Sequence, residues 1–93
     1  MSQKVRCHVR ISGKVQGVGY RMETRRTAEK LGVKGWVKNR SDGTVEAVFE
    51  GSQDAVDQLI EWCYSGPPNA NVKDIAKNWD EPIDNCQSFN SVY

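Results

Sequence analysis

Long apolar runs are absent from this sequence of 93 residues, in which no uninterrupted stretch of apolar side chains exceeds three. A helix that spans a membrane needs about 20 such residues, so we expect no association with membranes. The first eleven residues alternate between polar and apolar side chains and lack the apolar segment of a signal peptide. We therefore expect a cytoplasmic protein.

Histidine and paired cysteine motifs are also scarce. The sequence has one histidine, three cysteines and no C-x-x-C motif, which argues against a zinc site and against a dithiol redox centre. Cys7, Cys63 and Cys86 cannot all pair within one chain. In a reducing compartment we expect free thiols, with Cys7 and Cys63 as small core residues. A disulfide between two of the three is the alternative.

The net charge of +1 conceals a strong division along the chain. Residues 1–40 hold 11 basic and two acidic side chains, whereas residues 41–93 hold two basic and 10 acidic ones. Such asymmetry points to an anionic partner for the basic part. Hydrophobic residues make up 38% of the chain, and there are no repeats or low-complexity linkers. The sequence therefore predicts a single globular domain over residues 1–93.

The spacing of apolar residues predicts strands where they alternate with polar ones and helices where they recur every three or four positions. The expected elements are a strand at 4–11, a helix at 21–31, a hairpin of strands at 35–40 and 44–50, a helix between its N-cap Ser52 and Gly66, a strand at 71–79, and a short closing strand at 89–93. This order matches the α+β ferredoxin-like split βαβ plan, a mostly antiparallel sheet of four to five strands with two helices on one face. The cationic side of the first strand is then expected on the solvated face.

A glycine-rich segment, Gly13 to Arg21, joins the first strand to the first helix. Such a loop can direct successive backbone N–H groups at one point, and the helix N-terminus behind it adds unpaired N–H groups and a positive dipole end. Arg21 places a cation at this same positive end, which is unfavourable without a ligand. A bound dianion removes the conflict, so the segment predicts an anion site.

Known nucleotide motifs do not fit this segment. It lacks the Gly-Lys-Ser/Thr of a Walker loop, and Met22 stands where a dinucleotide fingerprint has its third glycine. Three motifs instead resemble the acylphosphatase family: Gly13-Lys14-Val15-Gln16-Gly17-Val18-Gly19-Tyr20-Arg21, Gly35-Trp36-Val37-Lys38-Asn39-Arg40 and Asp42-Gly43-Thr44-Val45-Glu46. The resemblance extends to Gly66-Pro67-Pro68-Asn69-Ala70 and to Phe89 and Tyr93. Lys14 stands where arginine is more usual, and Tyr20, where phenylalanine is usual, could alter the edge of the site.

The resemblance implies hydrolysis of the carboxyl–phosphate bond of acyl phosphates, a small-molecule substrate. It implies that Arg21 binds the phosphate and that Asn39 positions the attacking water. The backbone N–H groups that would cradle the phosphate belong to Val15, Gln16, Gly17, Val18, Gly19 and Tyr20. No metal, cofactor or covalent intermediate is expected from the family. Nothing in the sequence demands more than a monomer.

Two other function classes compete with this interpretation. An RNA-recognition module would share the fold and suit the basic half, but the outward side of the first strand carries no aromatic residue on which a base could stack. We therefore expect no nucleic-acid partner. A regulatory anion-binding domain without catalysis would not need Asn39. His8 is expected to be an exposed strand residue, the three tryptophans to pack in the core and at its rim, and Arg25, Arg26 and Lys30 to form a solvated helix face.

Overall fold

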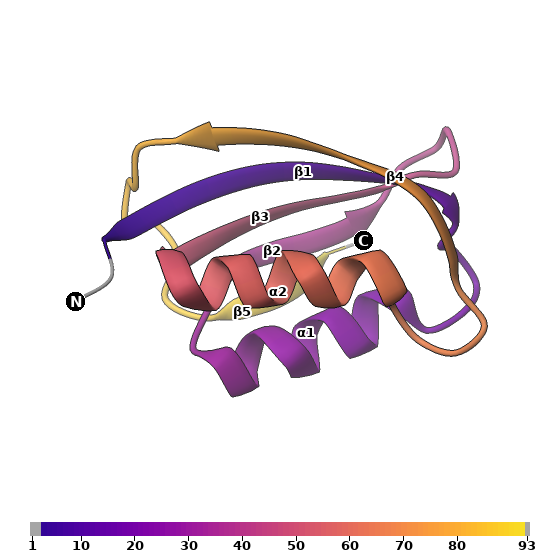
Figure 1. Ribbon diagram of the computed structural model, residues 1–93, viewed down its shortest axis with the longest axis horizontal. Helices are drawn as coiled ribbons and strands as arrows, with labels where there is room; N and C mark the ends of the chain where they lie inside the picture. The colour runs from indigo at the N-terminus through magenta and orange to yellow at the C-terminus, as the bar shows by residue number, and fades with distance from the viewer. Residues whose placement is uncertain (1–2, 93) are drawn as a thin grey trace.

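The computed structural model describes residues 3–92. Its elements follow the predicted order: β1 (Lys4–Lys14), α1 (Tyr20–Leu31), β2 (Lys34–Asn39), β3 (Val45–Ser52), α2 (Gln53–Ser65), β4 (Asn71–Asp80) and β5 (Phe89–Val92) (Figure 1). Tyr93, the last residue of the expected closing strand, lies outside the described residues. The bounds of the other elements differ from the predicted ones by a few residues at most.

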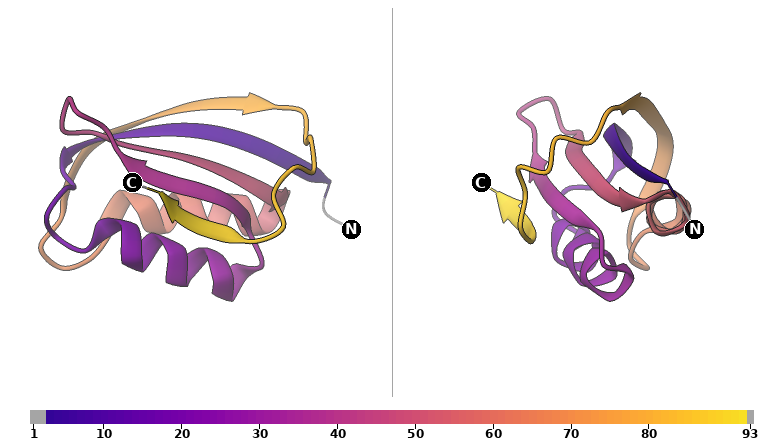
Figure 2. Two further views of the ribbon diagram at one scale, coloured as in Figure 1. Left: turned by 180° about the vertical axis from the view of Figure 1, so that it is seen from behind. Right: turned by 90° about the vertical axis from the view of Figure 1, so that its left-hand side faces the viewer.

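The five strands form one sheet in the order β4-β1-β3-β2-β5. Neighbouring strands are antiparallel, except that β5 runs parallel to β2. Both helices lie on the same face of the sheet (Figures 1 and 2). The predicted α+β ferredoxin-like fold, with a mostly antiparallel sheet and two helices on one face, is confirmed.

The core lies between the sheet and the two helices. Alternate residues of β1 and β3 are fully buried there, as are the residues of α2 that recur at helical spacing: Cys7, Val9, Ile11, Val45, Ala47, Phe49, Val56, Leu59 and Cys63. The prediction that Cys7 and Cys63 are core residues is confirmed, and all three cysteines are free. Burial raises the pKa of the Cys63 thiol to about 12, so this thiol stays protonated at neutral pH.

The helix ends follow local sequence signals. Ser52 caps α2, because its hydroxyl accepts a hydrogen bond from the backbone N–H of Ala55 at 3.2 Å. Gly32 ends α1 in the left-handed conformation, with φ of 74°, as expected of a C-terminal glycine. The start of α1 differs from that of α2. Its N-cap residue is Gly19, which offers no side chain to the first backbone N–H groups.

The first strand is longer than predicted. Gly13 and Lys14, expected in the loop, pair with Val72 and Asn71 of β4 after a register shift at Ser12/Gly13. A Cβ at Gly13 would lie only 2.2 Å from the Asn71 carbonyl oxygen, so this glycine permits close strand pairing rather than a turn. The loop before α1 is thereby limited to residues 15–19.

The outer face of the sheet is solvated at the exposed Lys4 and Arg10, as expected, but acidic side chains of β3 share this face with the basic ones. Glu46 and Glu50 of β3 lie between the basic strands β1 and β2. The Arg6 guanidinium contacts Glu50 at 2.8 Å, and only 3% of the Glu50 side chain is exposed. Glu46 contacts both His8 at 2.6 Å and Arg40 at 2.7 Å. Part of the charge division along the sequence is therefore neutralised where β3 meets its two basic neighbours.

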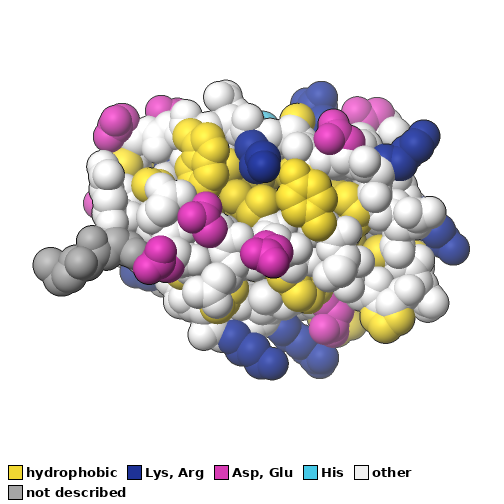
Figure 3. Space-filling model, in the orientation of Figure 1, with side chains coloured by type: hydrophobic (Ala, Val, Ile, Leu, Met, Phe, Trp, Pro, Cys, Tyr) yellow, Lys and Arg dark blue, Asp and Glu magenta, His cyan; other side chains and the backbone are white. Residues whose placement is uncertain are grey.

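Of the three tryptophans, which were expected in the core and at its rim, only Trp62 packs against the core. Trp62 packs against the Tyr20 ring, whereas Trp36 lies on the outer face beside His8. Trp79 is 46% exposed, and exposed apolar side chains gather over α2 and β4 (Figure 3). Within residues 3–92, neither helix has the length and apolar character needed to cross a membrane.

Candidate active site

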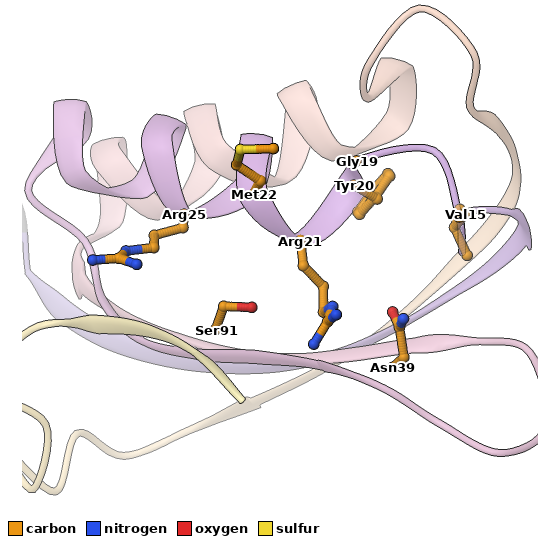
Figure 4. Close-up of a pocket in the computed structure, with 9 residues that line it drawn as sticks. Val15, Gly19, Tyr20, Arg21, Met22, Arg25, Asn39 and Ser91 are labelled. Carbon is orange, nitrogen blue, oxygen red and sulfur yellow. The ribbon is translucent and has the colours of Figure 1, made fainter. Parts of the chain in front are cut away.

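One pocket of about 410 Å³ brings the start of α1 close to the end of β2. Its lining combines the loop, the first two turns of α1 and residues from β2 and β5: Val15, Gly17, Gly19, Tyr20, Arg21, Met22, Arg25, Asn39 and Ser91 (Figure 4). Arg21 and Asn39, which are 18 positions apart in the sequence, thus face one cavity. The structure brings together the two side chains that the resemblance singled out.

The loop before α1 depends on glycine for its backbone conformation. Gly17 and Gly19 adopt φ of 74° and 79°, a left-handed region that residues with a Cβ rarely occupy. A Cβ at either position would meet no atom within 4 Å, so the requirement is conformational rather than steric. The loop delivers the uncapped N-terminus of α1 to the pocket. The first N–H groups of a helix have no intrahelical acceptor, which makes this end suitable for an anion.

Asn39 reaches the pocket because of strand alternation. It is the last residue of β2 and is in phase with Val37, which is fully buried on the side covered by the helices. Arg40, the next residue, points to the other face and pairs with Glu46 at 2.7 Å. The spacing from Val37 is thus a sequence signal for the orientation of Asn39, although it says nothing about chemistry.

The Arg21 guanidinium extends across the pocket toward the last strand. Its Nη1 donates a hydrogen bond to the carbonyl oxygen of Val92 on β5, at 2.9 Å. This contact holds the side chain at the pocket, beside the positive end of its own helix. The sequence places Arg21 at the helix start, but it gives no signal that β5 supplies an acceptor, because that contact spans 71 positions.

Gln16 links the loop to the hairpin that carries Asn39. Its side-chain amide donates to the carbonyl oxygens of Arg40 at 2.7 Å and Thr44 at 2.9 Å. Gln16 is not among the lining residues of the pocket, and neither is Val18, which packs against the core. Of the six residues expected to offer backbone N–H groups, Val15, Gly17, Gly19 and Tyr20 line it.

Tyr20, one of the two residues that depart from the family pattern, uses its side chain for helix packing. Only 1% of the residue is exposed, and its hydroxyl donates to the Cys63 carbonyl at 2.6 Å, near the C-terminal end of α2. Burial raises the pKa of this hydroxyl far above its ordinary value, so it remains a donor. Although Tyr20 borders the pocket, its phenol group is committed to α2.

Three lining residues were not predicted as part of the site: Met22, Arg25 and Ser91. Arg25 was expected on a solvated helix face, yet it borders the pocket. Its spacing of four from Arg21 is the sequence signal that could have placed both on one side of α1. For Ser91, no such signal exists, because its place follows from the parallel pairing of β5 with β2.

The charged side chains that line the pocket within residues 3–92 are the two guanidinium groups of Arg21 and Arg25. His8 is not part of it and contacts Glu46 on the outer face of the sheet, as predicted for a strand residue. Within residues 3–92, no group of three or more His, Cys, Asp or Glu side chains is placed to hold a metal ion. The arrangement suits a small anion bound by backbone N–H groups and a guanidinium, with a carboxamide beside it.

Comparison with known proteins gives a consistent result. The acylphosphatase family model matches residues 7–91. An acylphosphatase of Chloroflexus aurantiacus is 59% identical over 89 residues, which cover 96% of this chain and 97% of that protein. Among solved structures, the acylphosphatase from Bacillus subtilis superimposes with a TM-score of 0.93 at 35% identity, covering 96% of this chain and 99% of the other. An acylphosphatase from Coxiella burnetii gives 0.90 at 39% identity, covering 96% and 93%.

Proposed function

Because the chain belongs to the acylphosphatase family, we propose the following roles for its residues in the hydrolysis of acyl phosphates to a carboxylate and inorganic phosphate. Arg21 and the loop N–H groups bind the phosphoryl group, and Asn39 orients the attacking water. The observation that carries this assignment is the shared pocket, in which the side chains of Arg21 from α1 and Asn39 from β2 lie next to each other beside the glycine-rich loop (Figure 4).

The leaving group explains why so few residues suffice. When water attacks phosphorus, the phosphorus–oxygen bond to the acyl group breaks and its electron pair stays on the carboxylate. Carboxylic acids have a pKa of about 4, so this group departs without a general acid. The proton released by the water passes to the phosphate product or to solvent. Transfer of a phosphoryl group is loose, so positioning and charge stabilisation supply most of the catalysis.

Arg21 and the loop divide the stabilisation of charge between them. A guanidinium offers paired donors that match two phosphoryl oxygens. The backbone N–H groups of the loop and of the first turn of α1 point at the remaining oxygens without adding a mobile charge. The hydrogen bond from Arg21 to Val92 supports this role, because it fixes the guanidinium before the substrate binds.

Asn39 suits the orientation of water because its side chain is neutral. A carboxamide can accept a hydrogen bond from the water and donate another, whereas a carboxylate in the same place would repel the phosphoryl group. Asn39 lies at the end of a strand that Gln16 connects to the loop. The position of the water relative to phosphorus is therefore set by the sheet and the loop together.

The test is hydrolysis of benzoyl phosphate by the purified protein, with phenyl phosphate as a monoester control, each with and without a chelator. We expect turnover of benzoyl phosphate alone, unchanged by the chelator. Turnover of the monoester at a comparable rate would contradict the proposal, because a phenol is a much weaker acid and needs protonation to leave. Failure to hydrolyse benzoyl phosphate, with tight oligonucleotide binding, would favour the nucleic-acid alternative.

The wider setting belongs to the same proposal. We propose a monomer in the cytoplasm that acts on a small acyl phosphate and requires neither a cofactor nor a nucleic-acid partner. The pocket lies within one chain and takes its residues from the loop, α1, β2 and β5 of that chain. Sedimentation of the purified protein would test the oligomeric state.

A further inference from the structure

The pocket continues past the residues that the proposed hydrolysis uses. Across Figure 4 the labelled side chains run in the order Asn39, Arg21, Ser91 and Arg25. The first two belong to the phosphoryl end. Ser91 and Arg25 line the same cavity on the side of Arg21 that faces away from Asn39 (Figure 4). In phosphoryl transfer the attacking and leaving oxygens lie roughly in line, so a water oriented by Asn39 directs the leaving acyl group to this side.

Arg25 is placed to reach this end of the pocket by the geometry of α1. It follows Arg21 by four residues, so the two lie on one side of the helix and about 6 Å apart along its axis. Its Nε is 3.5 Å from Glu29 Oε2, and the two side chains are 52% and 53% exposed. Such an exposed pair is weak, and the two terminal nitrogens of the guanidinium carry further donors.

Ser91 adds a hydroxyl group between the two arginines. It belongs to β5, whose pairing with β2 places Ser91 next to Val37, two residues before Asn39. A serine hydroxyl can donate to a carboxylate or phosphate oxygen. Among residues 3–92, the side chains that line the pocket include no acidic one, so an anion at this end meets the Ser91 hydroxyl and the Arg25 guanidinium.

We propose that Arg25, with Ser91, binds a second anionic group on the acyl part of the substrate. Arg25 is then a specificity-determining residue, and the preferred substrates are acyl phosphates whose acyl group carries a further carboxylate or phosphate. This inference rests on the proposed function, because it takes the phosphoryl group to lie at Arg21. Each of the two anions is matched to its own guanidinium, whereas a neutral acyl group leaves Arg25 with only its exposed contact to Glu29.

The test compares two substrates of the same shape, 4-carboxybenzoyl phosphate and its neutral analogue 4-nitrobenzoyl phosphate, and includes 3-carboxybenzoyl phosphate to vary the direction of the second anion. The variant is Arg25→Gln. The matched control is Arg26→Gln, which removes the same charge from the same helix at a residue that pairs with Glu23 and does not line the pocket.

We expect Arg25→Gln to raise KM about 3- to 10-fold for at least one carboxybenzoyl phosphate, while KM for 4-nitrobenzoyl phosphate and kcat stay within about twofold. Arg26→Gln should shift KM for all three substrates alike. Equal losses on charged and neutral substrates in Arg25→Gln, or the same selective loss in Arg26→Gln, would overturn the inference. If the wild-type protein does not hydrolyse 4-nitrobenzoyl phosphate, the proposed function itself fails.

Discussion

The side chain of Gln16 and the carbonyl oxygen of Arg40 are joined by a hydrogen bond of 2.7 Å, which connects the glycine-rich loop to the strand end beside Asn39. This bond fixes the distance between the glycine-rich loop and the end of β2, although these two parts of the site come from different elements. A side chain that does not itself line the pocket holds the glycine-rich loop against the hairpin.

Replacement of Gln16 by methionine should weaken both stability and catalysis. The variant keeps the size of the side chain but loses two hydrogen bonds, to Arg40 and Thr44. We expect a loss of about 1–2 kcal/mol in the free energy of unfolding, measured with urea. Because the loop is then no longer held in a fixed position relative to Asn39, kcat should fall between about 10- and 100-fold.

Gln58→Met is the control for this variant, because Gln58 is exposed on α2, away from the pocket. It should change stability by no more than about 0.5 kcal/mol. An unchanged kcat in Gln16→Met, despite lost stability, would show that the link between loop and hairpin is structural only.

Asn39→Asp should be nearly as damaging as Asn39→Ala, because a carboxylate beside the phosphoryl group repels it and cannot orient the water in the same way. We expect kcat to fall at least about 100-fold in both variants. Asn78→Asp changes the net charge equally on β4, outside the pocket, and should retain activity. Near-wild-type turnover of Asn39→Asp would contradict the role assigned to a neutral carboxamide.

Arg21→Lys should restore little of the activity lost in Arg21→Ala, even though it keeps the positive charge. Lysine offers a single ammonium group instead of a planar fork, so paired contacts with two phosphoryl oxygens are lost. We expect kcat/KM to fall about 100-fold or more. Arg26→Lys, the same change on the exposed side of α1, is the control. Wild-type kinetics in Arg21→Lys would mean that charge alone binds the phosphate.

Gly19→Ala and Gly32→Ala form a matched pair that separates backbone strain from function. Both glycines have positive φ, 79° and 74°, and a Cβ at either meets no atom within 4 Å. Each variant should lose about 1 kcal/mol of stability. Only Gly19→Ala should also weaken inhibition by inorganic phosphate, because Gly19 belongs to the loop at the pocket. Equal phosphate affinity in the two variants would argue against the loop as the anion site.

Local patterns in the sequence account for most of the fold. The alternation of apolar and polar residues predicted β1, and two β-rich runs around an Asp-Gly turn predicted the hairpin of β2 and β3. Ser52 and Gly66 predicted the two ends of α2. The pairing of β5 with β2 was not predictable in this way, because a parallel neighbour leaves no local signal. For the same reason, neither the acceptor of Arg21 nor the place of Ser91 could be predicted.

At two places a tertiary contact changes what the local pattern alone predicts. Gly13 was predicted as a loop residue, but it belongs to β1, where its missing side chain allows the close approach of Asn71. The basic face of β1 is solvated at Lys4 and Arg10, as predicted, but Glu50 of β3 pairs with Arg6 and covers it. The arginine and the asparagine of the site were predicted together through the family resemblance. The structure adds that they share one pocket.

Glu46 should make the stability of the protein depend on pH in acid. The hydrogen bond with His8 and then that with Arg40 hold the pKa of this carboxyl below its ordinary value of 4.5. A pKa that is lower in the folded state stabilises the fold above the unfolded-state pKa, and this contribution disappears as pH falls through the folded-state value. Glu46→Gln removes the titrating group. Urea unfolding should therefore show the wild-type protein to be more stable than Glu46→Gln at pH 7, with a difference that shrinks steadily below pH 4.5. A difference that stays constant down to pH 3 would mean that the carboxylate contributes through packing or neutral hydrogen bonds rather than through its charge.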